Sequence, residues 1–143
     1  MNFITFISYD SLGNITQVQT TDADCASYIK APTGGGVLQA SSGGPFDTNF
    51  VSGNYIHGGA VTARIAMSLT VSTTSFPADG TSEATITGIP NGASVTISGA
   101  VTAGPETITD GELIVTSTTS GAIQVSITMR PAYQDWSTTL NAT

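Results

Sequence analysis

Apolar and polar positions alternate regularly in the second half of the chain. From about residue 63, aliphatic residues recur at every second position, and Ser, Thr or Gln fills most positions between them. Such alternation is typical of strands that bury one face. The apolar positions are Leu69 and Val71, Ala84 and Ile86, Val95 and Ile97, Leu113 and Val115, and Ile123, Val125, Ile127 and Met129. Turn residues recur about every 8 to 12 residues, which predicts an immunoglobulin-like sandwich of about seven strands.

The first half of the chain has shorter apolar runs. Met1–Tyr9 and Ile15–Thr20 have β-type patterns, and the turn-forming segment Asp10–Asn14 between them predicts a hairpin. Thr21–Ile29 has the spacing of one or two helical turns, with Thr21 or Asp22 as the cap.

Glycine-rich breaks divide the rest of the first half. A short strand is predicted at Val37–Ala40, between breaks at Gly34–Gly36 and Ser41–Pro45. Phe46–Ile56 mixes aromatic and polar residues with neither a strand nor a helical period, and we expect a turn at Gly53-Asn54. The predicted protein is all-β, with a β-rich N-terminal docking region at residues 1–62 and an immunoglobulin-like sandwich at residues 63–143.

Composition excludes several classes of function. The 143 residues include only three Lys and Arg against ten Asp and Glu, giving a net charge of −7. So few cations cannot neutralise a run of phosphates, so neither nucleic acid nor an anionic membrane is an expected partner. No run of 18 apolar residues suggests a membrane span, and MNFITFISYD lacks the basic start of a signal peptide. With Cys25 as the one cysteine, no internal disulfide is possible, which favours folding in a reducing cytoplasm.

The residues that could carry chemistry are scattered. His57 is the one histidine, and no nucleophile motif surrounds it. Cys25 has no histidine near it in sequence, so we interpret it as a small apolar residue in a helical turn. Asp22 and Asp24 alone offer too few oxygens for calcium. Asp79-Gly80 and Asp110-Gly111 are explained as turns, the second as a hairpin turn, and Gly34–Gly36 lacks the Gly-Lys-Ser/Thr of a phosphate-binding loop. No catalytic, cofactor or metal site is predicted.

Several phrases of the sequence resemble known modules. Phe76–Ala93 (FPADGTSEATITGIPNGA) resembles the "aDGts-ati-gIP-ga" phrase of bacterial and phage immunoglobulin-like modules. Ile123–Asp135 (IQVSITMRPAYQD) resembles the last strands of small tail-associated proteins of tailed bacteriophages, with Ala132 separating Pro131 from Tyr133. Asp10–Ile15 and Tyr55–Arg64 are similar to phrases of the same proteins. The resemblance implies a non-enzymatic virion component, made in the host cytoplasm, released by lysis, and present in multiple copies on the tail, baseplate or fibre.

The first strand suggests how such a component would dock. Met1–Tyr9 is apolar and almost uncharged at a chain end, so we expect an edge strand that needs a covering partner. Aromatic residues further along would contribute to the same contact, unless they pack only between the two halves of the chain. The candidate contact residues are Phe3, Ile4, Phe6, Ile7, Phe46, Phe50 and Tyr55.

Other functions remain open on the sequence. A capsid decoration protein would have a similar sequence signature. A glycan-binding module for host adsorption would present aromatics on one face, and the sandwich offers Phe76, Tyr133 and Trp136. A depolymerase would need a carboxylate pair that no motif identifies. We expect Trp136 to pack over the edge of the sandwich core.

Overall fold

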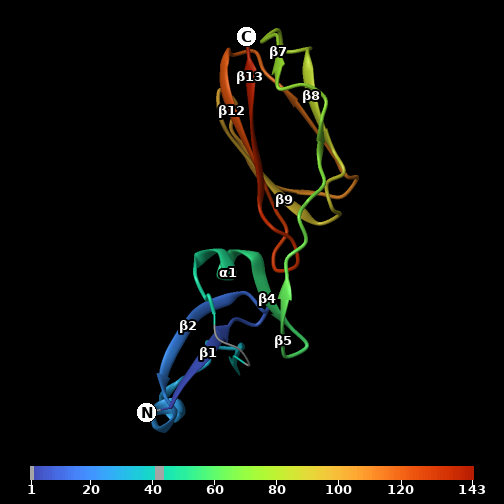
Figure 1. Ribbon diagram of the computed structural model, residues 1–143. Coiled ribbons are helices and arrows are strands. Elements are labelled where there is room, and N and C mark those ends of the chain that lie inside the picture. The colour runs from blue at the N-terminus through green and yellow to red at the C-terminus, as the bar shows by residue number, and fades with distance from the viewer. Residues whose placement is uncertain (1, 41–43) are drawn as a thin grey trace. The chain divides into compact units, whose positions relative to one another are not determined.

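The computed structural model describes residues 2–40 and 44–143. The chain forms two compact units, Met1–Arg64 and Ile65–Thr143, where the sequence predicted a division between residues 62 and 63. Residues 41–43 of the predicted break at Ser41–Pro45, and Met1 of the predicted first strand, lie outside the described residues. Both units are built mainly of strands, so the protein is all-β (Figure 1).

The C-terminal unit is an immunoglobulin-like sandwich of two sheets. One sheet has the order β10-β9-β12-β13-β7 and the other has the order β11-β8-β6. The strands are β6 (Thr70–Val71), β7 (Ser75–Phe76), β8 (Glu83–Thr87), β9 (Ala93–Gly99), β10 (Ala103–Ile108), β11 (Glu112–Thr116), β12 (Gly121–Thr128) and β13 (Trp136–Ala142). The first strand is divided, since β6 pairs with β8 in one sheet and β7 runs parallel to β13 in the other.

The alternating positions read from the sequence form the core of this sandwich. Ile123, Val125 and Ile127 of β12 are fully buried, and the Gln, Ser and Thr residues between and after them are partly exposed. The complete set of buried core residues is Phe76, Ala84, Ile86, Ile89, Ala93, Val95, Ile97, Ile108, Val115, Ile123, Val125, Ile127, Leu140 and Ala142. Trp136 stands opposite Ile127 in the sheet and packs, partly buried, against this core, as predicted.

One turn of the sandwich has a different role from the predicted one. Asp110-Gly111 was expected to close a hairpin, but β10 pairs with β9 and β11 pairs with β8, in different sheets. The hairpin prediction is wrong because the segment crosses from one sheet to the other. The local chemistry is still that of a turn, since the Asp110 carboxylate accepts from the Glu112 N–H at 3.2 Å and Gly111 has φ +82°.

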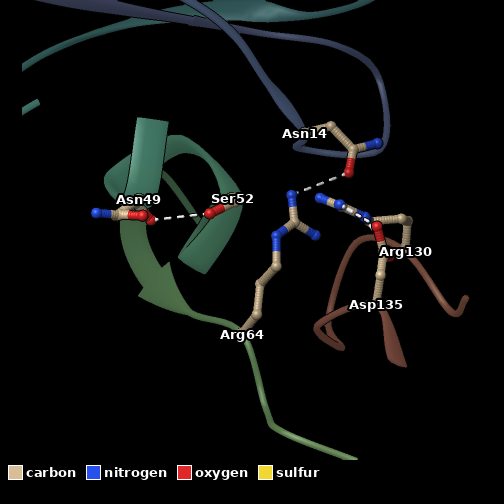
Figure 2. Close-up of polar contacts among 6 residues, drawn as sticks. All are labelled: Asn14, Asn49, Ser52, Arg64, Arg130 and Asp135. Carbon is tan, nitrogen blue, oxygen red and sulfur yellow. Dashed lines mark hydrogen bonds and ion pairs between the residues drawn. The ribbon is translucent and has the colours of Figure 1, made fainter. Parts of the chain in front are cut away.

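An ion pair closes the connection between β12 and β13. The Arg130 guanidinium donates to Asp135 from Nε at 2.9 Å and from Nη2 at 2.6 Å, as Figure 2 shows. These hydrogen bonds raise the pKa of Arg130. Because both side chains are exposed, the pair fixes the shape of the loop more than it adds stability.

The N-terminal unit contains two small sheets and two short helices. The predicted hairpin is confirmed, since β1 (Phe3–Tyr9) pairs along its length with β2 (Ile15–Asp22). The other elements are the 3₁₀ helix η1 (Ala23–Tyr28), β3 (Gly36–Gln39), α1 (Thr48–Gly53), β4 (Asn54–His57) and β5 (Ala60–Ala63). The predicted helical segment after β2 is confirmed as η1, which Asp22 caps by accepting from the Asp24 N–H.

Two parts of this unit differ from the sequence expectation. The segment that showed no period contains α1, so the expected turn at Gly53-Asn54 is instead the passage from α1 into β4. The second difference is at His57-Gly58-Gly59, where no hairpin was predicted and where the chain turns between β4 and β5. Gly58 and Gly59 have φ of +58° and +77°, the pair of positive values that a two-residue type I′ turn requires.

Candidate protein-binding surface

The N-terminal unit has a small buried core. Among the described residues, its buried apolar residues are Ile7 of β1, Ile15 of β2 and Ile56 of β4. Partly buried side chains surround them: Tyr9, Val18, Leu38, Ala40, Phe46, Phe50 and Val51. Three buried isoleucines make a small core for a unit of this size. The apolar side chains packed around them therefore keep part of their surface in contact with solvent.

Helix α1 places two aromatic rings at this core. Asp47 caps the helix, because its carboxylate accepts from the Phe50 N–H at 2.9 Å. Phe46, just before the cap, meets Phe50 edge to face with 5.0 Å between ring centroids. The cap and the ring pair together fix where the chain enters the helix, and both rings contact the buried isoleucine cluster.

An open groove lies beside these rings. It has a volume of about 490 Å³, and its lining includes no charged side chain. The lining residues are Ile7, Leu38, Gln39, Ala40, Phe46, Phe50, Gly59, Ala60 and Val61. Val61 of β5 keeps 40% of its surface exposed at this groove. An apolar, uncharged groove on a β-rich unit is a suitable surface for an apolar segment of another protein.

The predicted contact residues of β1 do not form one surface. Neighbouring residues of a strand point to opposite faces, so Phe3 and Ile7 lie on one face of the sheet and Ile4 and Phe6 on the other. Phe3 is 62% exposed, Ile4 and Phe6 are partly buried, and Ile7 is part of the buried core.

The expectation that β1 is an edge strand is wrong. The sheet order is β2-β1-β3, which places β1 in the centre. Pairing with β3 takes up the second side of Phe6–Tyr9, and the Ala40 N–H donates to the Thr5 carbonyl at 2.8 Å. An incoming strand therefore cannot pair with β1 along that length.

Tyr55 is held in place by Arg64, the last residue of the Tyr55–Arg64 phrase. The Arg64 guanidinium lies 5.7 Å from the Tyr55 ring centroid. Its Nη2 donates to Asn14 Oδ1 at 3.2 Å (Figure 2). Arg64 is only 4% exposed. The arginine therefore joins the β1–β2 turn to β4, and Tyr55 has a structural contact in addition to any external one.

The polar residues with possible chemistry stand apart from one another. His57 is exposed next to the Gly58-Gly59 turn. Cys25 lies in the helical turn η1, as predicted, and its side chain is exposed. Within residues 2–40 and 44–143, no three His, Cys, Asp or Glu side chains come together as metal ligands.

Two aspartates instead organise turns. Partial burial raises the pKa of Asp10, but hydrogen bonds from Asn14 and from the Leu12 and Gly13 backbone outweigh it, so the pKa lies below its usual value. Asp79 accepts from the N–H and hydroxyl groups of both Thr81 and Ser82, and these bonds lower its pKa strongly. The Asp-Gly-Thr-Ser phrase is therefore a self-contained turn.

Comparisons with known proteins add little to this picture. No family model and no curated protein matches the chain. Among solved structures, a glycosyl hydrolase family 2 member from Bacteroides cellulosilyticus is similar, with 15% identity and a TM-score of 0.42. The match covers 99% of this chain and 21% of that one, so the chain spans about a fifth of the hydrolase. In the described residues, no helix is both long and apolar enough to cross a membrane.

Proposed function

We propose that the chain is a non-enzymatic structural protein of a tailed-bacteriophage virion. Its N-terminal unit docks on a tail, baseplate or fibre protein, and its sandwich is the module presented on the particle. The phrases shared with phage immunoglobulin-like modules, such as Phe76–Ala93, support the class of protein. The observation that carries the docking role is the open apolar groove at Phe46, Phe50 and Val61.

A docking partner would cover apolar surface that the small core of the N-terminal unit leaves exposed. Ile7, Ile15 and Ile56 are the buried apolar residues of the described part of this unit, which leaves apolar surface that a partner segment would cover. The partner chemistry follows from the lining, which offers aliphatic and aromatic contacts and the Gln39 side chain but no charge. Docking therefore depends weakly on salt concentration.

The test is incorporation into particles. Phage carrying Val61→Asp or Phe3→Asp in this protein are purified, and its amount per particle is measured by quantitative mass spectrometry. Ile114→Asp is the matched control, because Ile114 is a similarly exposed aliphatic residue on β11 of the sandwich, 51% exposed. We expect Val61→Asp to reduce incorporation at least tenfold, which corresponds to about 1.4 kcal/mol of binding free energy, and Ile114→Asp to leave it unchanged.

Two results would contradict the proposal. Incorporation of folded Val61→Asp and Phe3→Asp proteins at the wild-type level would exclude the groove and the exposed end of β1 as docking surfaces. Absence of the wild-type protein from purified particles would exclude the virion role itself. Imaging of the particle by cryo-microscopy separates a tail position from a capsid position.

A further inference from the structure

β2 has eight residues, and the backbone groups on its outer side are not paired with another strand along most of that length. β2 is the outermost strand of the order β2-β1-β3. Tyr55 of β4 bridges Asn14, just before β2 begins, and beyond that bridge no second strand pairs along the other side of β2 within the described residues. Its eight residues, ITQVQTTD, contain no Lys, Arg or Pro and one carboxylate, at Asp22. A strand of this kind presents unpaired backbone groups to any strand that approaches it.

The other outer strands are shorter than β2, and some carry proline or charge. β10 carries Pro105 and Glu106 at a break in its register with β9. β6 and β7 have two residues each, β3, β4 and β5 have four each, and β11 has five and begins at Glu112. Short length, proline, charge and irregular register are the usual means of preventing edge pairing. Because β2 has none of these along Ile15–Thr21, its open edge stands out from the edges of the same chain.

The register of the sheet identifies which backbone groups point outward. The Ala23 N–H donates to the Asn2 carbonyl at 2.9 Å, immediately beyond the pairing of Ile4 with Thr21. Hydrogen-bonded and non-hydrogen-bonded pairs alternate along an antiparallel ladder. The backbone of Gln19 and Thr21 therefore faces β1, whereas the N–H and C=O groups of Val18 and Thr20 face away from it.

We propose that two copies of the chain dimerise by antiparallel pairing of β2 with β2. A two-fold axis at Gln19 pairs Val18 of each copy with Thr20 of the other, so each pair exchanges two backbone hydrogen bonds. The two three-stranded sheets join into one continuous sheet. This interface is separate from the apolar groove, and it requires no other virion protein.

Side-chain chemistry favours a second copy as the occupant. At the axis, the two exposed Gln19 amides meet, and each can donate to and accept from the other. The Asp22 carboxylates of the two copies lie six residues apart along the paired strands, about 20 Å at 3.3 Å per residue. The chain has a net charge of −7, yet this contact brings no two like charges together.

The first experiment measures the oligomeric state of the purified full-length chain by sedimentation equilibrium. We expect a dimer for the wild type and a monomer for Gln19→Lys, which places two cations opposite each other at the axis. Thr96→Lys is the control, because Thr96 is exposed on β9 in the sandwich, and it is expected to stay dimeric.

The second experiment locates the axis by covalent trapping. In a Cys25→Ser background, Gln19→Cys should form a disulfide-linked dimer in air, because opposite residues of a non-hydrogen-bonded pair lie close enough for a disulfide. Thr96→Cys should remain unlinked. A monomeric wild type, a Gln19→Lys protein that stays dimeric, or equal linking of Gln19→Cys and Thr96→Cys would overturn the proposal.

Discussion

The sandwich and the N-terminal unit are both built of strands, but they differ in what those strands enclose. In the sandwich, two sheets cover a core whose members include Ile86, Val95, Ile127 and Leu140. In the N-terminal unit, the two small sheets share one cluster, whose buried apolar members among the described residues are Ile7, Ile15 and Ile56. Regular alternation over long strands encloses a core, whereas short strands separated by glycine leave apolar surface open.

Both local and distant polar contacts hold the units together. Turns of the sandwich are local, as at Asp79, whose partners are two and three residues away. The N-terminal unit relies on a contact between distant parts of its chain, from Arg64 to Asn14. The sandwich has distant contacts too, since the Thr143 N–H donates to the Phe76 carbonyl at 2.9 Å. The two units therefore differ in the size of their buried cores more than in the reach of their polar contacts.

The largest expected difference is in the thermal unfolding of the two units when each is expressed alone. Residues 65–143, expressed alone, should show a cooperative thermal transition, because their core is complete within the segment. Residues 1–64 should show none, because three buried isoleucines do not offset the entropy of ordering the segment. Circular dichroism during heating measures both. A cooperative transition in residues 1–64 and none in residues 65–143 would reverse the comparison.

The second prediction makes one substitution in each core. Ile127→Ala should cost the sandwich about 2–5 kcal/mol while its transition stays cooperative, because Ile127 is fully buried among many neighbours. Ile7→Ala should remove the ordered state of the N-terminal unit. Two-dimensional amide NMR spectra of the full chain give the readout for each unit. Unchanged dispersion of the residue 2–40 signals in Ile7→Ala would contradict this.

The third prediction concerns the edge of the sandwich core. Trp136 is partly buried, so Trp136→Ala should cost about 2–3 kcal/mol, below the 3–5 kcal/mol typical of fully buried aromatic residues. Chemical denaturation of residues 65–143 measures this loss. A loss below about 1 kcal/mol would mean that the indole makes little contact with the core, which the pairing of Trp136 with Ile127 does not allow.

The smallest expected effect is the pH dependence of one turn. The folded-state pKa of Asp79 lies below its unfolded value of about 3.8, so the ionised side chain stabilises the sandwich above that pH. This stabilisation declines as the pH falls below 3.8 toward the folded pKa. The melting-temperature difference between wild type and Asp79→Ala should therefore be largest near neutral pH and shrink in acid. Asp24→Ala, on η1, should leave the sandwich transition unchanged at every pH.

Local patterns were sufficient to predict the sandwich. Alternation at Ile123, Val125 and Ile127 reports burial directly, because each strand has one face in the core. Turn chemistry was also readable, as at Asp79-Gly80. The turn at Asp110-Gly111 was identified as a turn but assigned the wrong topology, since a turn sequence does not specify which sheet the next strand joins.

The candidate binding surface was harder to predict from the sequence, because it depends on a short helix and on contacts between distant residues. Helix α1 has six residues, among them Thr, Asn, Val and Gly, which have low helix propensity, so only the Asp47 cap marks it in the sequence. β1 looked like an edge strand because its second partner, β3, lies some thirty residues away along the chain. The burial of Arg64 against Tyr55 depends on contacts that no local pattern encodes.

The divided first strand of the sandwich has a mechanical consequence. The chain enters the unit at Ile65, which is bonded to the loop before β13, and leaves it at Thr143, beyond the opposite end of β13. β7 runs parallel to β13, so tension between Ile65 and Thr143 pulls these two strands in opposite directions. The bonds from Asn141 to Thr74 and from Thr143 to Phe76 then carry the load together in shear. Single-molecule stretching should show one abrupt rupture of this clamp, and a gradual extension would show that the load passes elsewhere.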